Sequence, residues 1–105
     1  MASYYVWSGA TGSANGTTWA NAYTTLTLAY ASGKLAGDVF YVAHDHAEST
    51  AGAVTLNVSG ASIANPIKVI CANRAGSVPP VSADRRATAT VTTTGANNIT
   101  LNGSE

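Results

Sequence analysis

The chain has 105 residues, enough for one small domain. Its five basic and five acidic residues cancel, and only 10% of the chain is charged, where about 25% is usual for soluble domains. This balance argues against binding to nucleic acid or to an anionic membrane, while a hydrophobic content of 46% argues against disorder. Polarity comes mainly from Thr, Ser, Asn and Gly, which favours β-structure with many turns.

The first elements in chain order are a strand, a loop and a helix. Residues 4–7 are aromatic and β-branched, which predicts a strand, and the Gly-rich residues 8–18 predict a loop. From residue 19 the apolar positions follow a helical period, which predicts an amphipathic helix over about residues 19–32. The apolar stripe of this helix is formed by Trp19, Ala22, Tyr23, Leu26, Ala29 and Tyr30.

The rest of the chain reads as short strands separated by turns. Residues 39–43 are apolar on both sides, as in a strand covered on both faces. Further strands are predicted over residues 54–58, 67–71, 88–93 and 98–101. A mainly β fold follows, either a small antiparallel β-sandwich or a β-solenoid. The unequal connections and the single helix favour the solenoid, with residues 1–38 as a capping region and residues 39–105 as the first coils of the same domain.

The sequence has its highest density of ionisable side chains in the stretch His44-Asp45-His46-Ala47-Glu48. In an extended strand His44, His46 and Glu48 would project to one side, which would suit a zinc or iron site. The alternative, which we favour, is an exposed polar turn in which Asp45 or Glu48 bonds nearby backbone N–H groups. We therefore predict no metal and no cofactor.

The sequence also bears on two other types of site, a glycosidase or hydrolase site and a glycan-stacking surface. The five acidic residues show no pairing that would predict glycosidase chemistry, and no Gly-x-Ser-x-Gly motif is present, so we expect no enzyme. An aromatic group could stack on a glycan, although burial beneath the helix is the simpler explanation. That group comprises Tyr4, Tyr5, Trp7, Trp19, Tyr23 and Tyr30.

Residues 4–48 resemble the opening of right-handed parallel β-helix proteins of the pectin-lyase-like superfamily. The resemblance lies in the aromatic strand, the Gly/Asn-rich loop, Trp19 with Ala22, and Ala36-Gly37-Asp38 before an apolar strand ending in Val42-Ala43. The later stretches "NPIKVICANRAG" and "TTTGANNITLNG" look like coil strands of phage and prophage structural proteins of this type.

The resemblance implies a non-enzymatic structural or assembly protein of a phage virion, associated with the capsid or the tail and made in the bacterial cytoplasm. Its partners would be other virion proteins or further copies of itself, for example in a trimer, with a glycan as an optional ligand. The alternatives are the non-catalytic N-terminal part of a β-helix polysaccharide-degrading enzyme or tailspike, and a free metal- or glycan-binding module.

The last predicted strand, over residues 98–101, is expected to have an edge that pairs with another strand. A solenoid generally needs about three repeats, and this sequence holds fewer, so its last coil would leave an open pairing edge. We expect this edge to be covered by further coils of a longer protein or by a partner. The edge comprises Asn98, Ile99, Thr100, Leu101 and Asn102.

Overall fold

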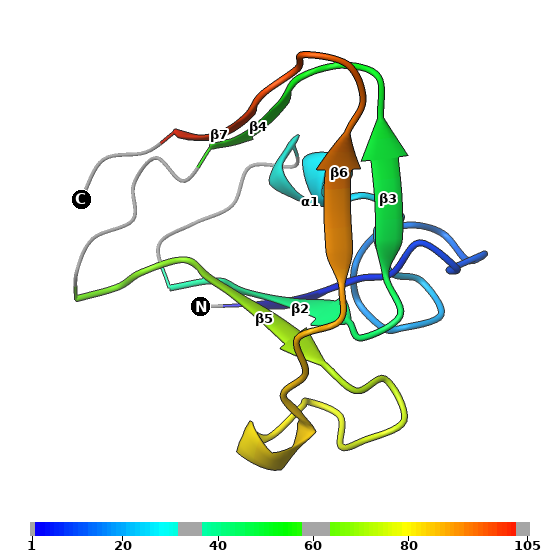
Figure 1. The fold of residues 1–105 in the computed structure, drawn as a ribbon. Helices are drawn as coiled ribbons and strands as arrows, with labels where there is room; N and C mark the ends of the chain where they lie inside the picture. The colour runs from blue at the N-terminus through cyan, green and yellow to red at the C-terminus, as the bar shows by residue number, and fades with distance from the viewer. Residues whose placement is uncertain (1, 32–36, 58–63, 103–105) are drawn as a thin grey trace.

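The computed structural model describes residues 2–31, 37–57 and 64–102, and it is mainly strand (Figure 1). In these ranges one short α-helix and one turn of 3-10 helix accompany the strands. The elements in chain order are β1 (Ser3–Val6), α1 (Leu26–Ala31), β2 (Val39–Ala43), β3 (Ala47–Thr50), β4 (Val54–Asn57), β5 (Lys68–Ala72), η1 (Ser82–Asp84), β6 (Thr90–Thr93) and β7 (Ile99–Asn102).

The strands form three separate parallel sheets. One sheet has the order β1-β2-β5, and the others pair β3 with β6 and β4 with β7. Consecutive strands β2, β3 and β4 thus belong to three different sheets, and β5, β6 and β7 repeat this order beside them (Figure 1). Because every strand ladder in the described part of the chain is parallel, the antiparallel sandwich alternative is wrong.

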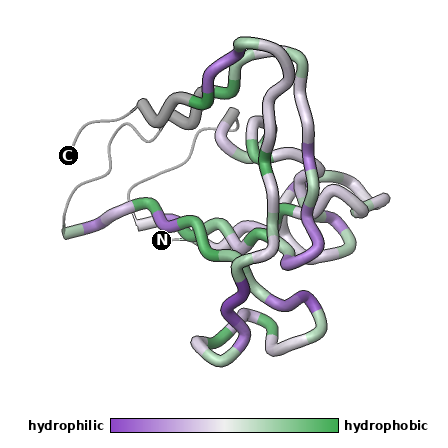
Figure 2. Tube along the Cα trace, viewed as in Figure 1, coloured by the Kyte–Doolittle hydropathy of each residue, from purple (hydrophilic) through white to green (hydrophobic). Residues whose placement is uncertain are grey.

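The core lies between the three sheets and is closed by α1. Phe40 and Val42 of β2 are almost fully buried, and Tyr30 of α1 and Val54 of β4 pack in the same cluster. The hydropathy tube in Figure 2 shows hydrophobic residues along the β1-β2-β5 sheet, whereas the loop between β5 and β6 carries strongly hydrophilic stretches. The apolar run of residues 39–43 is therefore a covered strand, as its composition predicted.

The helix is shorter than the sequence predicted. It begins at Leu26 rather than near residue 19, because Tyr23 is held in a strand-like bridge to Val6. The backbone N–H of Trp7 donates to the carbonyl of Tyr23, and the backbone N–H of Tyr23 donates to the carbonyl of Tyr5. These bonds fix the backbone of the segment in a non-helical conformation while its side chains are still buried. The predicted helix end at about residue 32 lies outside the described residues.

The segment before α1 covers the outer edge of β1. The N–H of Tyr5 bonds the carbonyl of Gly16, and Trp19 packs edge-on against the Tyr5 ring at a centroid distance of 4.7 Å. The expected burial of the aromatic group beneath the helix is thus correct for Tyr30, which stacks on Phe40, whereas Trp19 and Tyr23 lie outside the helix and pack beside β1. Gly16 has φ of +76°, a conformation that glycine adopts without strain, and the Tyr23 ring lies against it.

Most predicted strands are present, but one was missed. Strands β4, β5, β6 and β7 fall within or beside the predicted stretches. The missed strand is β3, which occupies Ala47–Thr50, where a turn was expected. Its inward-facing positions are Glu48 and Thr50 rather than aliphatic residues, so hydrophobic alternation gave no signal.

Candidate functional site

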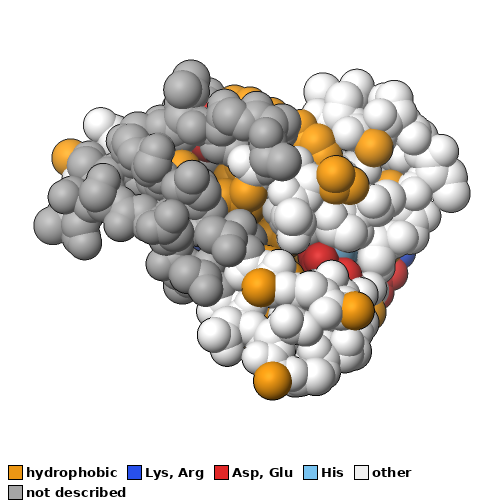
Figure 3. Space-filling view, turned by 90° about the horizontal axis from the view of Figure 1, so that it is seen from above, with side chains coloured by type: hydrophobic (Ala, Val, Ile, Leu, Met, Phe, Trp, Pro, Cys, Tyr) orange, Lys and Arg blue, Asp and Glu red, His pale blue; other side chains and the backbone are white. Residues whose placement is uncertain are grey.

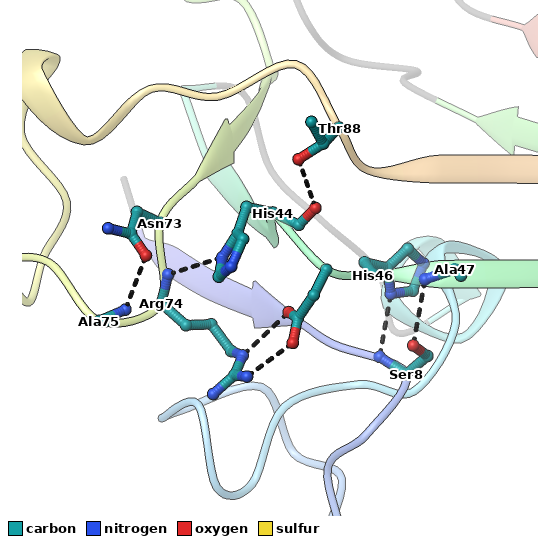
Figure 4. Close-up of polar contacts among 9 residues, drawn as sticks. Ser8, His44, His46, Ala47, Asn73, Arg74, Ala75 and Thr88 are labelled. Atoms are coloured by element: carbon teal, nitrogen blue, oxygen red, sulfur yellow. Dashed lines mark hydrogen bonds and ion pairs between the residues drawn. The ribbon is translucent and has the colours of Figure 1, made fainter.

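The His44–Glu48 segment splits into a turn and a strand. His44 and Asp45 form the turn, and His46 leads into β3. The His46 side chain is 0% exposed and its Nε2 lies 2.8 Å from Oε1 of Glu48. The Nδ1 of His46 accepts the N–H of Ser8 at 3.0 Å, and Figure 4 shows these two groups facing one another.

His46 and Glu48 together act as a structural clamp. Since Nδ1 accepts a hydrogen bond, the proton of the neutral ring sits on Nε2 and is donated to Glu48. The same Glu48 oxygen accepts the N–H of Leu26 at 2.7 Å, where α1 begins. The carboxylate thereby satisfies one of the free N–H groups at the helix start. The clamp joins the loop after β1, the strand β3 and the first turn of α1.

The expected exposed turn is therefore only partly correct, and the three candidate metal ligands do not converge. His46 has both ring nitrogens occupied, while Nδ1 of His44 accepts the N–H of Arg74 at 3.3 Å on a different loop. Within the part of the chain that the structure describes, no group of three His, Cys, Asp or Glu side chains could hold a metal ion. Glu48 bonds the distant Leu26 rather than the local backbone.

Asp45 forms a two-point ion pair with Arg74. Its carboxylate oxygens accept Nε of Arg74 at 3.0 Å and Nη2 at 2.6 Å (Figure 4). The Arg74 guanidinium also lies 3.8 Å from the Trp7 ring centroid, a cation–π contact. The hydrogen bond from Arg74 lowers the pKa of Asp45 from 3.8 to about 2. This cluster links the turn after β2 to the turn after β5.

Among the described residues, the predicted assembly edge is one of several strand edges without a paired strand. β7 pairs with β4 alone, and β5 and β6 are likewise the last strands of their sheets. The N–H groups of Thr90 and Thr94 point to β3, so those of Val91 and Thr93 point to the outer edge. The carbonyl of Asn98 accepts the N–H of Val54. By the same alternation, the backbone N–H and C=O of Ile99 point to the outer edge of β7. Side chains of Thr100, Leu101 and Asn102 lie outside the described set.

Apolar side chains accompany these edges. Val69 of β5 and Ile99 of β7 are each 47% exposed, although their partners Phe40 and Val54 are buried. In these two sheets the inward-facing row therefore continues to the edge without being fully covered by described residues. The space-filling view in Figure 3 shows another face, seen from above, on which some hydrophobic side chains lie singly and others gather toward the middle, with acidic side chains near the centre.

A groove runs beside β5 and was missed by the sequence analysis. It has a cavity volume of about 500 Å³, and the backbone of Arg86 closes one end of it by donating its N–H to the carbonyl of Cys71. An antiparallel bridge between Ala72 and Arg85 holds the two segments together. The groove is lined by Lys68, Val69, Ile70, Cys71, Arg85 and Arg86.

The groove is cationic because its basic residues lack acidic partners among the described residues. Of the six described lining residues, three are basic and none is acidic. All four carboxylates in the described part of the chain are bonded elsewhere: Asp38 to the N–H of Ala2, Asp45 to Arg74, Glu48 to His46, and Asp84 to two loop N–H groups. The Arg85-Arg86 pair was the only available signal, and it is 14 residues from Cys71 in the sequence.

None of the protein-family models, curated proteins or solved structures compared with the chain matches it. The candidate functions therefore rest on the chain's own geometry and on the sequence resemblance. In the described residues, no helix is both long and apolar enough to cross a lipid bilayer.

Proposed function

We propose that the chain forms the capped start of a right-handed parallel β-helix and serves as a non-enzymatic structural protein of a phage virion. In this proposal β2, β3 and β4 make up a first coil and β5, β6 and β7 a second. The parallel register of all three sheets supports it, because each strand of the second set lies beside its counterpart in the first. The sequence resemblance supplies the virion context.

The observation that carries the assembly role is the difference between the two ends. At one end, the segment from Gly16 to Tyr23 bonds the outer edge of β1. At the other end, β5, β6 and β7 have outward backbone groups that no described strand pairs, and Val69 of β5 and Ile99 of β7 are half-exposed. An edge of this kind pairs readily with further strands. We propose that strands of other virion proteins, of a second copy or of further coils cover it.

The alternative of a metal-binding module is weakened by the clamp. A metal ion at Nδ1 of His46 would displace the Ser8 N–H, whereas one at Nε2 would displace Glu48, which also bonds the start of α1. The alternative of a non-catalytic part of a β-helix enzyme or tailspike shares the same fold and edge. It differs in what surrounds the chain, which an experiment on the natural particle can decide.

The test is to purify phage particles from the phage or induced lysogen that encodes the chain and to quantify its peptides by mass spectrometry. We expect the chain in intact particles at a fixed ratio to the major capsid or tail protein. The control is a cytoplasmic protein of similar abundance, which particle purification should remove. Loss of the chain together with that control would refute the virion role.

A further inference from the structure

We propose that the groove beside β5 binds an extended, acidic peptide segment of a partner protein by strand addition. The groove comprises the open edge of β5 together with the cationic residues Lys68, Arg85 and Arg86. This inference deepens the proposed assembly role, and rests on it, by naming the class of partner strand that β5 takes. Three features of the groove support it: free backbone groups, uncompensated charge and an apolar floor.

The backbone of β5 offers one open pairing position. Lys68 donates its N–H to the carbonyl of Asp38, and the carbonyl of Ala72 accepts the N–H of His44. The backbone N–H and C=O groups of residues 68, 70 and 72 therefore point to β2, and those of residues 69 and 71 point to the groove. The carbonyl of Cys71 is taken by Arg86, whereas Val69 has no hydrogen-bond partner on that side among the described residues. An incoming strand can bond both backbone groups of Val69.

The charge of the groove selects an acidic occupant. Lys68, Arg85 and Arg86 are exposed and form no ion pair with any described carboxylate. The four described carboxylates are already bonded, so a second copy has no free acid among these residues to offer. Charge complementarity therefore favours a different protein over self-association at this groove.

The groove suits a peptide better than a nucleic acid. Its floor contains the half-exposed Val69 and the partly buried Ile70 and Cys71, which would contact alternate side chains of an added strand. Three cations are a small footprint for a phosphate backbone, and the chain as a whole carries no net charge. A phosphate also supplies no N–H to bond the carbonyl of Val69.

The experiment measures fluorescence anisotropy of a labelled short peptide of alternating glutamate and valine, titrated with the full chain. We expect saturable binding, and binding about tenfold or more weaker for the same peptide with glutamine in place of glutamate. The Arg85→Ala and Arg86→Ala double variant should lose a similar factor. Arg74→Gln removes one positive charge outside the groove and should bind like the parent chain. Circular dichroism checks that each variant is folded.

Val69→Pro separates strand addition from charge attraction alone. Proline removes the outward N–H and leaves the ladder to β2 intact, as edge strands allow. We expect Val69→Pro to weaken binding about tenfold or more, and Val69→Thr, which keeps the N–H, to change it little. Undiminished binding by folded Val69→Pro overturns the proposal, as does stronger binding of single-stranded oligothymidylate or no peptide binding at millimolar concentration.

The two proposals fail separately. A chain that binds the acidic peptide but is missing from purified particles retains the groove and loses the virion role. A chain present in particles at fixed ratio that does not bind the peptide retains the virion role and loses this inference.

Discussion

Tyr30 of α1 stacks on Phe40 of β2, with ring centroids 4.7 Å apart and ring planes inclined by 17°. Both residues are buried, and Phe40 is 0% exposed. The contact joins the helix to the central strand of the largest sheet. It is one of the contacts by which α1 closes the space between the sheets, together with its packing in the same core cluster as Val6 and Val54.

Replacing Phe40 tests this closure. Phe40→Ala should lower the free energy of unfolding by about 3–5 kcal/mol, the usual cost of removing a buried aromatic ring. The measurement is urea denaturation followed by circular dichroism. Leu28→Ala, on the exposed side of the same helix, is the control and should cost less than about 1 kcal/mol. Equal losses in the two variants would mean that α1 is not packed as described.

Replacing Glu48 tests the clamp. Glu48→Ala leaves the N–H of Leu26 and the Nε2–H of His46 buried without partners, at a cost of about 1–3 kcal/mol for each group. Glu48→Gln keeps an acceptor oxygen and should recover part of this loss. Ser49→Ala, on the exposed side of β3, provides the matched control for urea denaturation. The clamp would be disproved by a Glu48→Ala variant as stable as Ser49→Ala.

The Asp45–Arg74 pair predicts a dependence of stability on acid pH. The pKa of Asp45 is lower in the folded protein, about 2, than its ordinary value of 3.8. The pair therefore stabilises the fold above about pH 4 and loses this contribution as pH falls toward 2. Asp45 is 40% exposed, so solvent screening limits the gain to about 1 kcal/mol or less.

The measurement is the thermal midpoint of the parent chain and of Asp45→Asn between pH 2 and pH 6. We expect the parent chain to be more stable at pH 6 and the two curves to converge near pH 2. A constant offset across this range would show that the ion pair is not the origin of the difference.

Replacing Gly16 tests how the segment before α1 covers the outer edge of β1. Gly16→Ala places a methyl group against the Tyr23 ring at a φ of +76°, so it should cost at least about 1–2 kcal/mol from the backbone alone. Gly52→Ala is the matched control, because nothing lies within 4 Å of its added methyl group. Thermal unfolding monitored by circular dichroism compares the two. A smaller loss for Gly16→Ala than for Gly52→Ala would contradict the described turn.

How much of the fold could be predicted depended on whether local pattern and tertiary contact agreed. Residues 39–43 are apolar throughout and form β2 with the predicted bounds. Trp19 and Tyr23 follow a helical period, yet hydrogen bonds to β1 hold Tyr23 in a bridge, and no local pattern reports those bonds. β3 was hidden for a related reason, since the partner of Glu48 is the distant backbone of Leu26.

The same distinction applies to the candidate sites. The two-residue spacing in the sequence placed His46 and Glu48 on the same side of a strand, and the structure shows them in contact. Only the fold shows that the N–H of Ser8 occupies the second ring nitrogen of His46. The groove could not be predicted, because Arg85 and Arg86 reach β5 through a turn closed by backbone hydrogen bonds. The open edge at residues 98–102 stays a prediction as an assembly site.

The bonds between Tyr23 and the outer edge of β1 determine where the β1-β2-β5 sheet can take a further strand. The backbone groups of Tyr5 and the N–H of Trp7 on that edge are already bonded, so a strand of a second copy has no free ladder position to meet there. Among the described residues, strand addition to this sheet is therefore directed to its β5 edge, which gives the sheet a single direction of growth.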